Sequence, residues 1–298
     1  RLRDLQEEIA GHHKQGRFDR DFYRERLAVF TFRPPDQLPD ARSLIIVAVP
    51  EPQLRVTFTW GGSPRPVIVP PTFLLQKAPF RWRTFYPERQ IDGQVKALLA
   101  EVLGPAGYRV AQAVLPKKML AVHSGLGAYG RNNLCYVPGM GSFHRLVALC
   151  SDFSCSEDVW HEPRTMDTCE KCVACLRHCP TGAITAERFL LRAERCLTFH
   201  NERPGDVAFP SWIDRSWHRC LVGCMRCQLI CPQNRDFLEW IEDGPAFSQE
   251  ETALLVEGLP LDQLPPPLAG KLRHFDMLGL LEVLPRNLAL LLDRSGEH

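Results

Sequence analysis

Apolar residues in the N-terminal half follow two periods, one typical of helices and one typical of strands. Residues 4–30 place apolar side chains at helical spacing among mixed charges, whereas the apolar run Ser43–Val49 is short and is followed by Pro50 and Pro52. Such a run is typical of a buried strand. A second strand is predicted at Val67–Val69, and together these patterns indicate an α/β arrangement.

Beyond these strands the pattern predicts a helix, a strand hairpin and a helical C-terminal part. On the predicted helix, one face carries Ile91, Val95, Leu98, Leu99 and Val102, and we expect this face to pack on the sheet. The turn at 138–141 lies between apolar runs at 134–137 and 143–149, which predicts strand, turn and strand. From Glu250 onward, Leu-rich helical patterns are interrupted by three prolines and end in residues 280–293.

Composition and charge place the chain among globular proteins. Its 298 residues are 45% hydrophobic, which is enough for two or three domains with real cores. The net charge of +1 gives no global field that favours nucleic acid or an acidic membrane. No apolar run approaches the roughly 20 residues that cross a bilayer, so we expect a cytoplasmic protein without a membrane partner.

Most of the twelve cysteines fall in tight groups, which favours metal binding over disulfides. The run Cys169-x2-Cys172-x2-Cys175-x3-Cys179-Pro180 matches the bacterial ferredoxin pattern, in which three thiolates bind one [4Fe-4S] cluster and the fourth reaches a second cluster. A zinc site needs only four thiolates in a tetrahedron and would not explain this spacing. The run therefore predicts iron.

A second group, Cys224-x2-Cys227-x3-Cys231-Pro232, repeats the last three positions of that run. Leu221 stands where the pattern has its first Cys, Cys220 is one place out of register, and Cys196 lies further upstream. Either Cys220 or Cys196 must complete a second cluster, because thiolates are the commonest ligands. Of the remaining cysteines, we expect Cys135 and Cys150 to be small buried hydrophobes and Cys155 to be a surface thiol.

The glycine-rich stretch Ser124–Gly130 contains the spacing G-x-G-x-x-G, and Asp152 follows 22 residues after Gly130. A dinucleotide-binding fold uses this pattern only when a helix starts at the loop. Here residues 131–133 lead into a predicted strand, which disfavours that interpretation. The loop is then either a close backbone approach to a bulky ligand or a tight turn with no ligand.

The order of these motifs resembles the epoxyqueuosine reductase family and, more distantly, the reductive dehalogenases. The segments that carry the resemblance are Leu38–Ser43, His123–Asn132, Gly141–Phe143, Cys169–Pro180, Arg195–Cys196 and Cys224–Asn234, and Pro285–Leu288 is similar to the family's helical-repeat segment. The resemblance implies an α+β protein with a nitroreductase-like α/β domain at 1–165, a ferredoxin-like double-cluster domain at 166–240 and a helical appendage at 241–298.

The resemblance also implies cofactors and a reaction. In the family, electrons pass through two clusters to a base-off cobalamin, whose Co(I) state reduces an epoxide in a tRNA nucleoside; an external donor such as ferredoxin or flavodoxin is implied. The implied cluster ligands are Cys169, Cys172, Cys175 and Cys231 for the first cluster and Cys179, Cys196, Cys224 and Cys227 for the second. The residues implied to border the corrin are Gly125, Leu126, Gly127, Tyr129, Gly130, Asn132, Asn133 and Ser142.

Two segments depart from the family pattern. The register of the family's proton-donating Asp falls on Ala111–Val114, and no Asp occurs between Asp92 and Asp152. A further family stretch is replaced by Trp82–Pro87. We therefore assign no catalytic acid and leave the substrate open; other side chains that could donate a proton in a pocket are His123, His144, Lys117, Lys118 and Tyr129.

Two alternatives to a cobalamin-dependent reductase follow from the residues. The chain could be a cobalamin-free electron-transfer protein that serves a partner, as the missing proton donor suggests. It could also bind tRNA through interleaved basic and aromatic side chains, although we favour the simpler interpretation that the aromatic side chains pack inward and the charged side chains are solvated. The residues of this segment are Lys77, Phe80, Arg81, Trp82, Arg83, Phe85, Tyr86 and Arg89.

Overall fold

The computed structural model describes residues 1–71, 90–275 and 277–293. The chain divides into two compact units. The first unit comprises Arg1–Pro50, Gln76–Val173 and Ala186–Leu191, and the second comprises Glu51–Leu75, Ala174–Thr185 and Arg192–His298. The domain boundaries after residues 165 and 240 stay a prediction.

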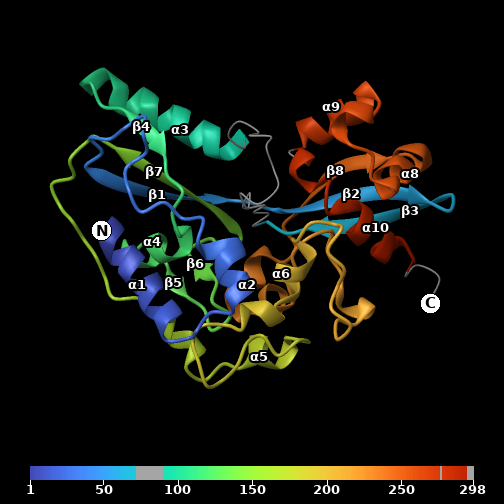
Figure 1. The fold of residues 1–298 in the computed structure, drawn as a ribbon, viewed down its shortest axis with the longest axis horizontal. Coiled ribbons are helices and arrows are strands. Elements are labelled where there is room, and N and C mark those ends of the chain that lie inside the picture. Colours follow the sequence, from blue (N-terminus) through green and yellow to red (C-terminus); the bar gives the residue numbers. More distant parts are fainter. Residues whose placement is uncertain (72–89, 276, 294–298) are drawn as a thin grey trace. The chain divides into compact units, whose positions relative to one another are not determined.

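The first unit is built on a three-stranded antiparallel sheet with the order β1-β7-β4. β7 (His144–Ser151) lies in the middle, between β1 (Ser43–Pro50) and β4 (Val110–Gln112), and all eight of its residues are buried. Helix α3 (Gln90–Leu103) contacts β4 and β7, and helix α4 (Lys117–His123) contacts β1 and β7 (Figure 1). The central strand therefore reads as a continuous buried run because helices cover the sheet.

The buried side of α3 differs from the predicted one. Leu98 and Val102 are 60% and 65% exposed, so the expectation that they pack on the sheet is wrong. The helix instead buries Asp92 in its first turn, and the Asp92 Oδ1 atom accepts a hydrogen bond from Arg145 Nε of β7 at 2.7 Å. This buried ion pair fixes the rotation of the helix, which an apolar pattern alone cannot reveal.

The N-terminal helical region is interrupted. It consists of α1 (Leu2–Lys14), α2 (Arg20–Phe22) and one π-helical turn at Tyr23–Leu27. Leu5 of α1 joins the core beneath the sheet together with Leu120 of α4 and Cys150 of β7. Cys150 is 1% exposed, as expected for a cysteine that serves as a small hydrophobe.

Both strands of the predicted hairpin form, but they do not pair with each other, so the predicted hairpin is wrong. β6 (Cys135–Tyr136) pairs with β5 (Ala128–Tyr129), which lies upstream in the glycine-rich stretch, while β7 joins the main sheet. Val137 bridges to Gly141 across the expected turn. The glycine-rich loop is therefore one arm of a small hairpin.

The second unit contains a three-stranded sheet with the order β3-β2-β8. β2 (Gln53–Trp60) and β3 (Ser63–Val69) are antiparallel, and Gly61 and Gly62 supply the positive φ angles of 58° and 73° that their two-residue turn needs. β8 (Ile241–Phe247) adds to β2 in parallel. The predicted strand at Val67–Val69 thus forms part of β3 and pairs with its neighbour β2, and it is β2 that also pairs with a segment far along the chain.

Three helices follow β8 in the second unit: α8 (Gln249–Glu257), α9 (Pro266–His274) and α10 (Leu284–Asp293). α8 contacts β2, β8 and α10 and starts with a capping box in which Ser248 and Glu251 bond each other's backbone N–H. Pro266 occupies the first turn of α9, where its missing N–H costs nothing. The proline run therefore starts a helix as well as interrupting the pattern.

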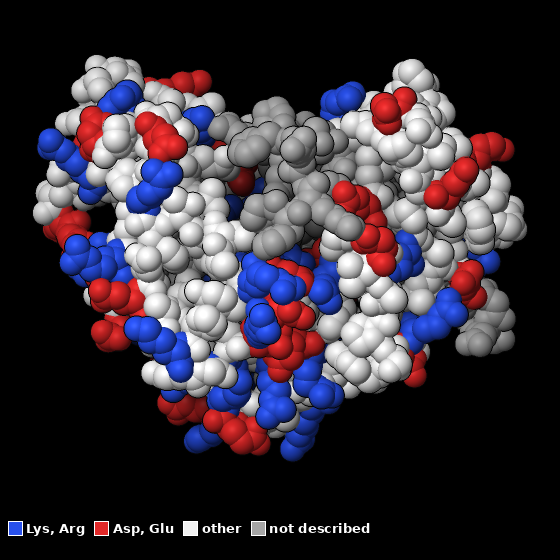
Figure 2. Space-filling model, in the orientation of Figure 1, with Lys and Arg blue, Asp and Glu red and all other residues white. Residues whose placement is uncertain are grey.

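Figure 2 shows acidic and basic side chains interspersed over the visible face of the described residues. This distribution agrees with the balanced composition of 36 basic and 35 acidic residues. Among the described segments, no helix is both long enough and apolar enough to cross a membrane.

Candidate functional site

The first cysteine run is folded into tight turns. Cys169 ends a 3-10 turn at Asp167–Cys169, and Cys175 lies in the short helix α5 (Ala174–His178). Cys179 follows the helix directly, before Pro180. Because proline disfavours helical backbone in the residue that precedes it, the helix ends before Cys179.

The second group lies in the second unit. Cys196 sits between a 3-10 turn (Ala193–Arg195) and α6 (Leu197–Asn201), and Cys227 lies in α7 (Arg226–Leu229). Helices α5 and α7 contact each other. Met225, just before α7, has a positive φ of 57°, an uncommon conformation for a residue with a side chain.

Three cysteines of the second unit gather: Cys179, Cys196 and Cys224. Burial, with smaller contributions from the Cys196 and Cys179 thiols, raises the pKa of the Cys224 thiol to about 12. Burial also raises the pKa of Cys196, with Cys179 again contributing. Thiols that oppose one another's ionisation in this way suit a metal centre, because a bound metal deprotonates its thiol ligands.

Cys220 takes a different position. It is 5% exposed, it bridges to Ile68 of β3, and its Sγ lies 3.8 Å from the Cys224 carbonyl oxygen. Cys196 is thus the residue that the structure places with both Cys179 and Cys224. The complete ligand sets of the two clusters stay a prediction.

The donor set itself fits iron–sulfur clusters, because eight thiol side chains in this spacing are what two [4Fe-4S] clusters require. Within 1–71, 90–275 and 277–293, no three Cys, His, Asp or Glu side chains stand close enough to hold one metal ion.

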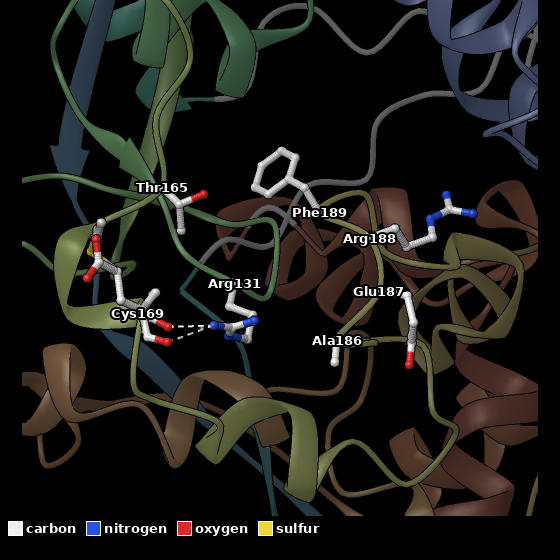
Figure 3. A pocket seen from close by; sticks show the side chains of 9 residues that line it. Arg131, Thr165, Cys169, Ala186, Glu187, Arg188 and Phe189 are labelled. Carbon is white, nitrogen blue, oxygen red and sulfur yellow. Dashed lines mark hydrogen bonds between the residues drawn. The ribbon is translucent and has the colours of Figure 1, made fainter.

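A cavity of about 360 Å³ opens beside Cys169 in the first unit. Figure 3 shows Arg131 within it, with its guanidinium turned toward Cys169, and Glu187 and Arg188 directed away from Arg131. The Phe189 ring packs edge-on against Tyr129, with 5.0 Å between the ring centres. The cavity is lined by Arg131, Thr165, Met166, Cys169, Glu170, Ala186, Glu187, Arg188 and Phe189.

The glycine-rich loop is followed by a strand rather than a helix, since β5 begins at Ala128. It therefore lacks the helix N-terminus that a dinucleotide-binding loop requires. Asp152, the candidate ribose ligand of that interpretation, accepts hydrogen bonds from the backbone N–H and the Nε of Arg109 at 2.7 and 2.9 Å. Both observations exclude the dinucleotide interpretation.

The glycines of the loop are explained by contacts within the protein. A Cβ atom at Gly127 would lie 2.6 Å from the Tyr136 carbonyl oxygen, and one at Gly130 would lie 2.5 Å from the Tyr136 ring. Gly125 has a φ of +78°, and a Cβ there would lie 2.9 Å from the His161 ring. Close packing against β6 thus requires Gly127 and Gly130 with or without a ligand.

Several other residues predicted to border a corrin are buried. Tyr129, Asn132 and Ser142 are 6%, 3% and 2% exposed, and Asn132 Nδ2 donates to the Tyr136 hydroxyl at 3.0 Å. Of the predicted set, Gly125 is exposed, and Leu126, Gly127 and Asn133 are partly exposed. A macrocycle could therefore meet only the rim of this loop.

At the register of the family's proton donor, the structure reveals a carboxylate that the sequence analysis missed. Gln112 Nε2 lies 3.4 Å from Asp92 Oδ2, and Asp92 also pairs with Arg145 at 2.7 Å and with Lys117 at 3.5 Å. Asp92 precedes Gln112 by 20 residues, so only the packing of α3 on the sheet brings them together. Its two cationic neighbours make it part of a structural ion-pair cluster.

The other candidate proton donors are engaged or buried. His123 contacts the Glu8 carboxylate at 2.8 Å and the His161 carbonyl oxygen at 2.7 Å. Burial lowers the pKa of His144 and raises that of Tyr129. Lys118 Nζ donates to the Asn133 carbonyl oxygen at 2.9 Å. The predicted basic and aromatic tRNA-binding segment, Lys77 to Arg89, lies outside the described residues.

Comparison with known proteins agrees with the motifs. Residues 168–234 match the family described as "4Fe-4S double cluster binding domain". The chain is 34% identical over 150 residues to epoxyqueuosine reductase of Vibrio cholerae, which covers 49% of this chain and 39% of that protein. The relative from Staphylococcus aureus is 26% identical over 237 residues, covering 78% and 58% respectively. The chain thus spans roughly two to three fifths of the length of these relatives.

The fold is also similar to solved structures. Epoxyqueuosine reductase from Streptococcus thermophilus matches 99% of this chain and 75% of that chain, with a TM-score of 0.59 and 18% identity. Our prediction of a resemblance to epoxyqueuosine reductases is therefore confirmed, as is a mixed α/β fold with a double-cluster segment. The nitroreductase-like character of the first unit stays a prediction.

Proposed function

We propose that this chain is an iron–sulfur oxidoreductase that accepts single electrons at two [4Fe-4S] clusters and uses them, together with a bound cobalamin, to reduce a substrate. The observation that carries the proposal is the gathering of Cys179, Cys196 and Cys224 in the second unit, within a segment that matches double-cluster domains. An external protein such as ferredoxin or flavodoxin would supply the electrons.

The cobalamin part of the proposal rests on the similarity to epoxyqueuosine reductases. The residues that would hold the group are those of the glycine-rich loop that keep an open surface, chiefly Gly125, Leu126 and Asn133. When bound, cobalamin would supply a strongly reducing metal centre. The chain itself would offer the exposed residues of the glycine-rich loop as a contact surface for the cobalamin and would hold the cluster-binding cysteines in place.

Anaerobic reconstitution tests the proposal directly. Purified protein should bind about eight iron per chain, as two cubanes require, and should show the broad visible absorption of thiolate-bound iron. Addition of cobalamin should then change the cobalamin spectrum at one equivalent per chain. A protein that takes up zinc but no iron would refute the iron–sulfur function.

A second candidate function is electron transfer without cobalamin, to a partner protein. It is favoured by the internal packing of the glycine loop, where Tyr136 already fills the space beside Gly127 and Gly130. The same reconstitution distinguishes the two functions, because an electron-transfer protein would bind eight iron and leave the cobalamin spectrum unchanged.

The substrate is proposed from the relatives alone. One solved epoxyqueuosine reductase is described with an epoxyqueuosine-modified tRNA stem loop, and modified tRNA is therefore the first substrate to test. Against it stands the lack of an Asp at the register of the family's acid, residues 111–114, where Gln112 is the nearest polar side chain. An amide can bond an oxygen but cannot protonate it at neutral pH.

A further inference from the structure

We propose that Arg131 is a positioning residue that holds the first cluster-binding loop and raises the reduction potential of the cluster bound there. The inference rests on the proposed iron–sulfur function and concerns one side chain of the hairpin. Arg131 belongs to the turn between β5 and β6, which is remote in sequence from the cysteines it contacts.

The guanidinium of Arg131 donates hydrogen bonds to two backbone carbonyl groups of the cluster-binding loop. Its Nη2 donates to the Cys169 carbonyl oxygen at 2.6 Å and its Nε donates to the Cys172 carbonyl oxygen at 3.0 Å. Figure 3 shows the guanidinium facing this loop across the cavity. Two carbonyl groups that lie three residues apart are thus fixed by one planar group, a task that suits arginine's rigid fork.

Backbone hydrogen bonds also connect the hairpin to the segment that leads into the cluster-binding loop. Tyr129 N–H donates to the Arg164 carbonyl oxygen at 3.0 Å, and Met166 N–H donates to the Tyr129 carbonyl oxygen at 2.8 Å. Cys169 N–H then donates to the Met166 carbonyl oxygen at 2.9 Å. The hairpin therefore carries both the segment that leads into Cys169 and the side chain that holds Cys169 and Cys172. A change in the packing of the hairpin should therefore also move the cluster-binding loop.

The charge of Arg131 acts on the same cluster. Among the described residues, the hydrogen-bond partners of its side chain are backbone carbonyls of Cys169, Cys172 and Glu170. Its positive charge therefore lies against the backbone of the loop that carries two of the predicted ligands of the first cluster. A cluster becomes more negative when it is reduced, so a nearby cation stabilises the reduced form and raises the potential.

The effect should be confined to one cluster. Cys169 and Cys172 are both predicted ligands of the first cluster, whereas the predicted ligands of the second cluster, Cys179, Cys196, Cys224 and Cys227, all belong to the second unit. A general loss of stability would affect both clusters alike, so the potential of each cluster separates a positioning role from a merely structural one.

The experiment is an electron paramagnetic resonance titration of the reconstituted full chain against potential, with iron content measured first. Arg131→Met should lower the midpoint potential of one cluster and leave the other unchanged. Arg131→Lys keeps the charge but loses the fork, so its shift should be smaller. Arg188→Met is the matched control, because Arg188 lines the same cavity but bonds the Leu190 and Arg17 carbonyl oxygens; both potentials should stay unchanged.

The iron content and the two cluster potentials of the variants distinguish support for the proposal from its refutation. Selective loss of one cluster in Arg131→Met, with a shifted potential for that cluster in Arg131→Lys, would support the proposal. Unchanged potentials in Arg131→Met at full iron content, or equal effects on both clusters, would overturn it. Failure of the unsubstituted chain to bind iron would instead refute the proposed function, so the two failures are distinguishable.

Discussion

The glycine-rich hairpin of the first unit and the cysteine group of the second unit are both dense motifs, but they differ in what satisfies their residues. In the hairpin, the absent side chains of Gly127 and Gly130 make room for Tyr136, and Asn132 bonds the Tyr136 hydroxyl. In the cysteine group, buried thiols raise one another's pKa. The hairpin residues are satisfied by contacts with one another, whereas the buried thiols oppose one another's ionisation.

This difference separates motifs that build a fold from motifs that bind something. Substituting residues that pack on and hydrogen-bond one another should lower the free energy of unfolding. Substituting residues whose buried thiols raise one another's pKa should abolish ligand binding while the fold persists. The predictions below apply this criterion to each region.

The largest expected effect is on the cysteine group. Cys196→Ala should lose one of two clusters, about four of about eight iron per chain, because Cys196 lies with Cys179 and Cys224. Iron analysis and electron paramagnetic resonance of the reconstituted protein would measure the loss, and circular dichroism should show that the fold persists.

Cys220→Ala is the matched control for that substitution. Cys220 is also buried and also lies beside Cys224. Its backbone, however, bridges to Ile68 of β3, and we expect Cys220→Ala to leave both clusters intact. Iron loss in Cys220→Ala with full iron in Cys196→Ala would show that the ligands are assigned wrongly.

The next effect concerns catalysis. Opening an epoxide leaves an oxygen that must be protonated, and a positioned acid contributes on the order of 10²- to 10⁴-fold to such a step. Because no Asp stands at the register of the family's acid, where Gln112 is the nearest polar side chain, and Asp92 beside Gln112 is paired with Arg145, we expect epoxyqueuosine reduction to be slow or absent. The assay is anaerobic, with cobalamin, reductant and epoxyqueuosine-containing tRNA, followed by nucleoside analysis.

Gln112→Asp is the informative variant in that assay. It returns a carboxyl group to the register of the family's donor, and the neighbouring Asp92 carboxylate should favour its protonated form, as a like charge does. Higher activity in this variant would assign the missing step to the acid. Efficient conversion by the unsubstituted chain would contradict the prediction and direct attention to His123, Tyr129 or His144.

A smaller effect is expected from the ion-pair cluster of the first unit. Asp92→Asn should destabilise the protein by about 3–5 kcal/mol, because removing one partner of a buried pair leaves an uncompensated charge; Arg145 is only 4% exposed. Unfolding in urea would measure the change. Asp36→Asn removes the exposed pair with Arg33 and should alter stability little, and a similar effect of both variants would contradict the prediction.

The sequence predicted several of the local elements and the cluster motif, because strand runs, helical periodicity and cysteine spacing are encoded by neighbouring residues. It could not predict contacts between distant segments. The rotation of α3 depends on the Asp92–Arg145 pair, and the pairing of β2 with β8 joins Gln53 to Ile241. Both are set by tertiary packing, which a local pattern does not contain.

The glycine-rich loop could not be interpreted from the sequence alone for the same reason, because its neighbours are set by tertiary packing. Its glycines were expected either to admit a ligand or to form a tight turn, and sequence spacing cannot distinguish these. The structure adds the neighbour that decides for Gly127 and Gly130, namely Tyr136 on β6. Likewise, the bonds from Arg131 to Cys169 and Cys172 join two motifs that the sequence analysis treated separately.

The smallest effect tests whether the hairpin is complete within the protein. Gly127→Ala should destabilise the fold by about 1–3 kcal/mol, the usual cost of overpacking, because the new Cβ would lie 2.6 Å from the Tyr136 carbonyl oxygen and 2.8 Å from Cys135 Sγ. Backbone atoms cannot move aside as a flexible side chain can, so β5 and β6 would have to separate. Gly104→Ala is the control, since nothing lies within 4 Å of its Cβ position and its φ is ordinary; its stability should be unchanged or slightly higher. Urea unfolding and a cobalamin titration should be made on both variants. If Gly127→Ala kept its stability and its iron but lost cobalamin affinity, the loop would be a ligand site, and the distinction between the two regions would fail.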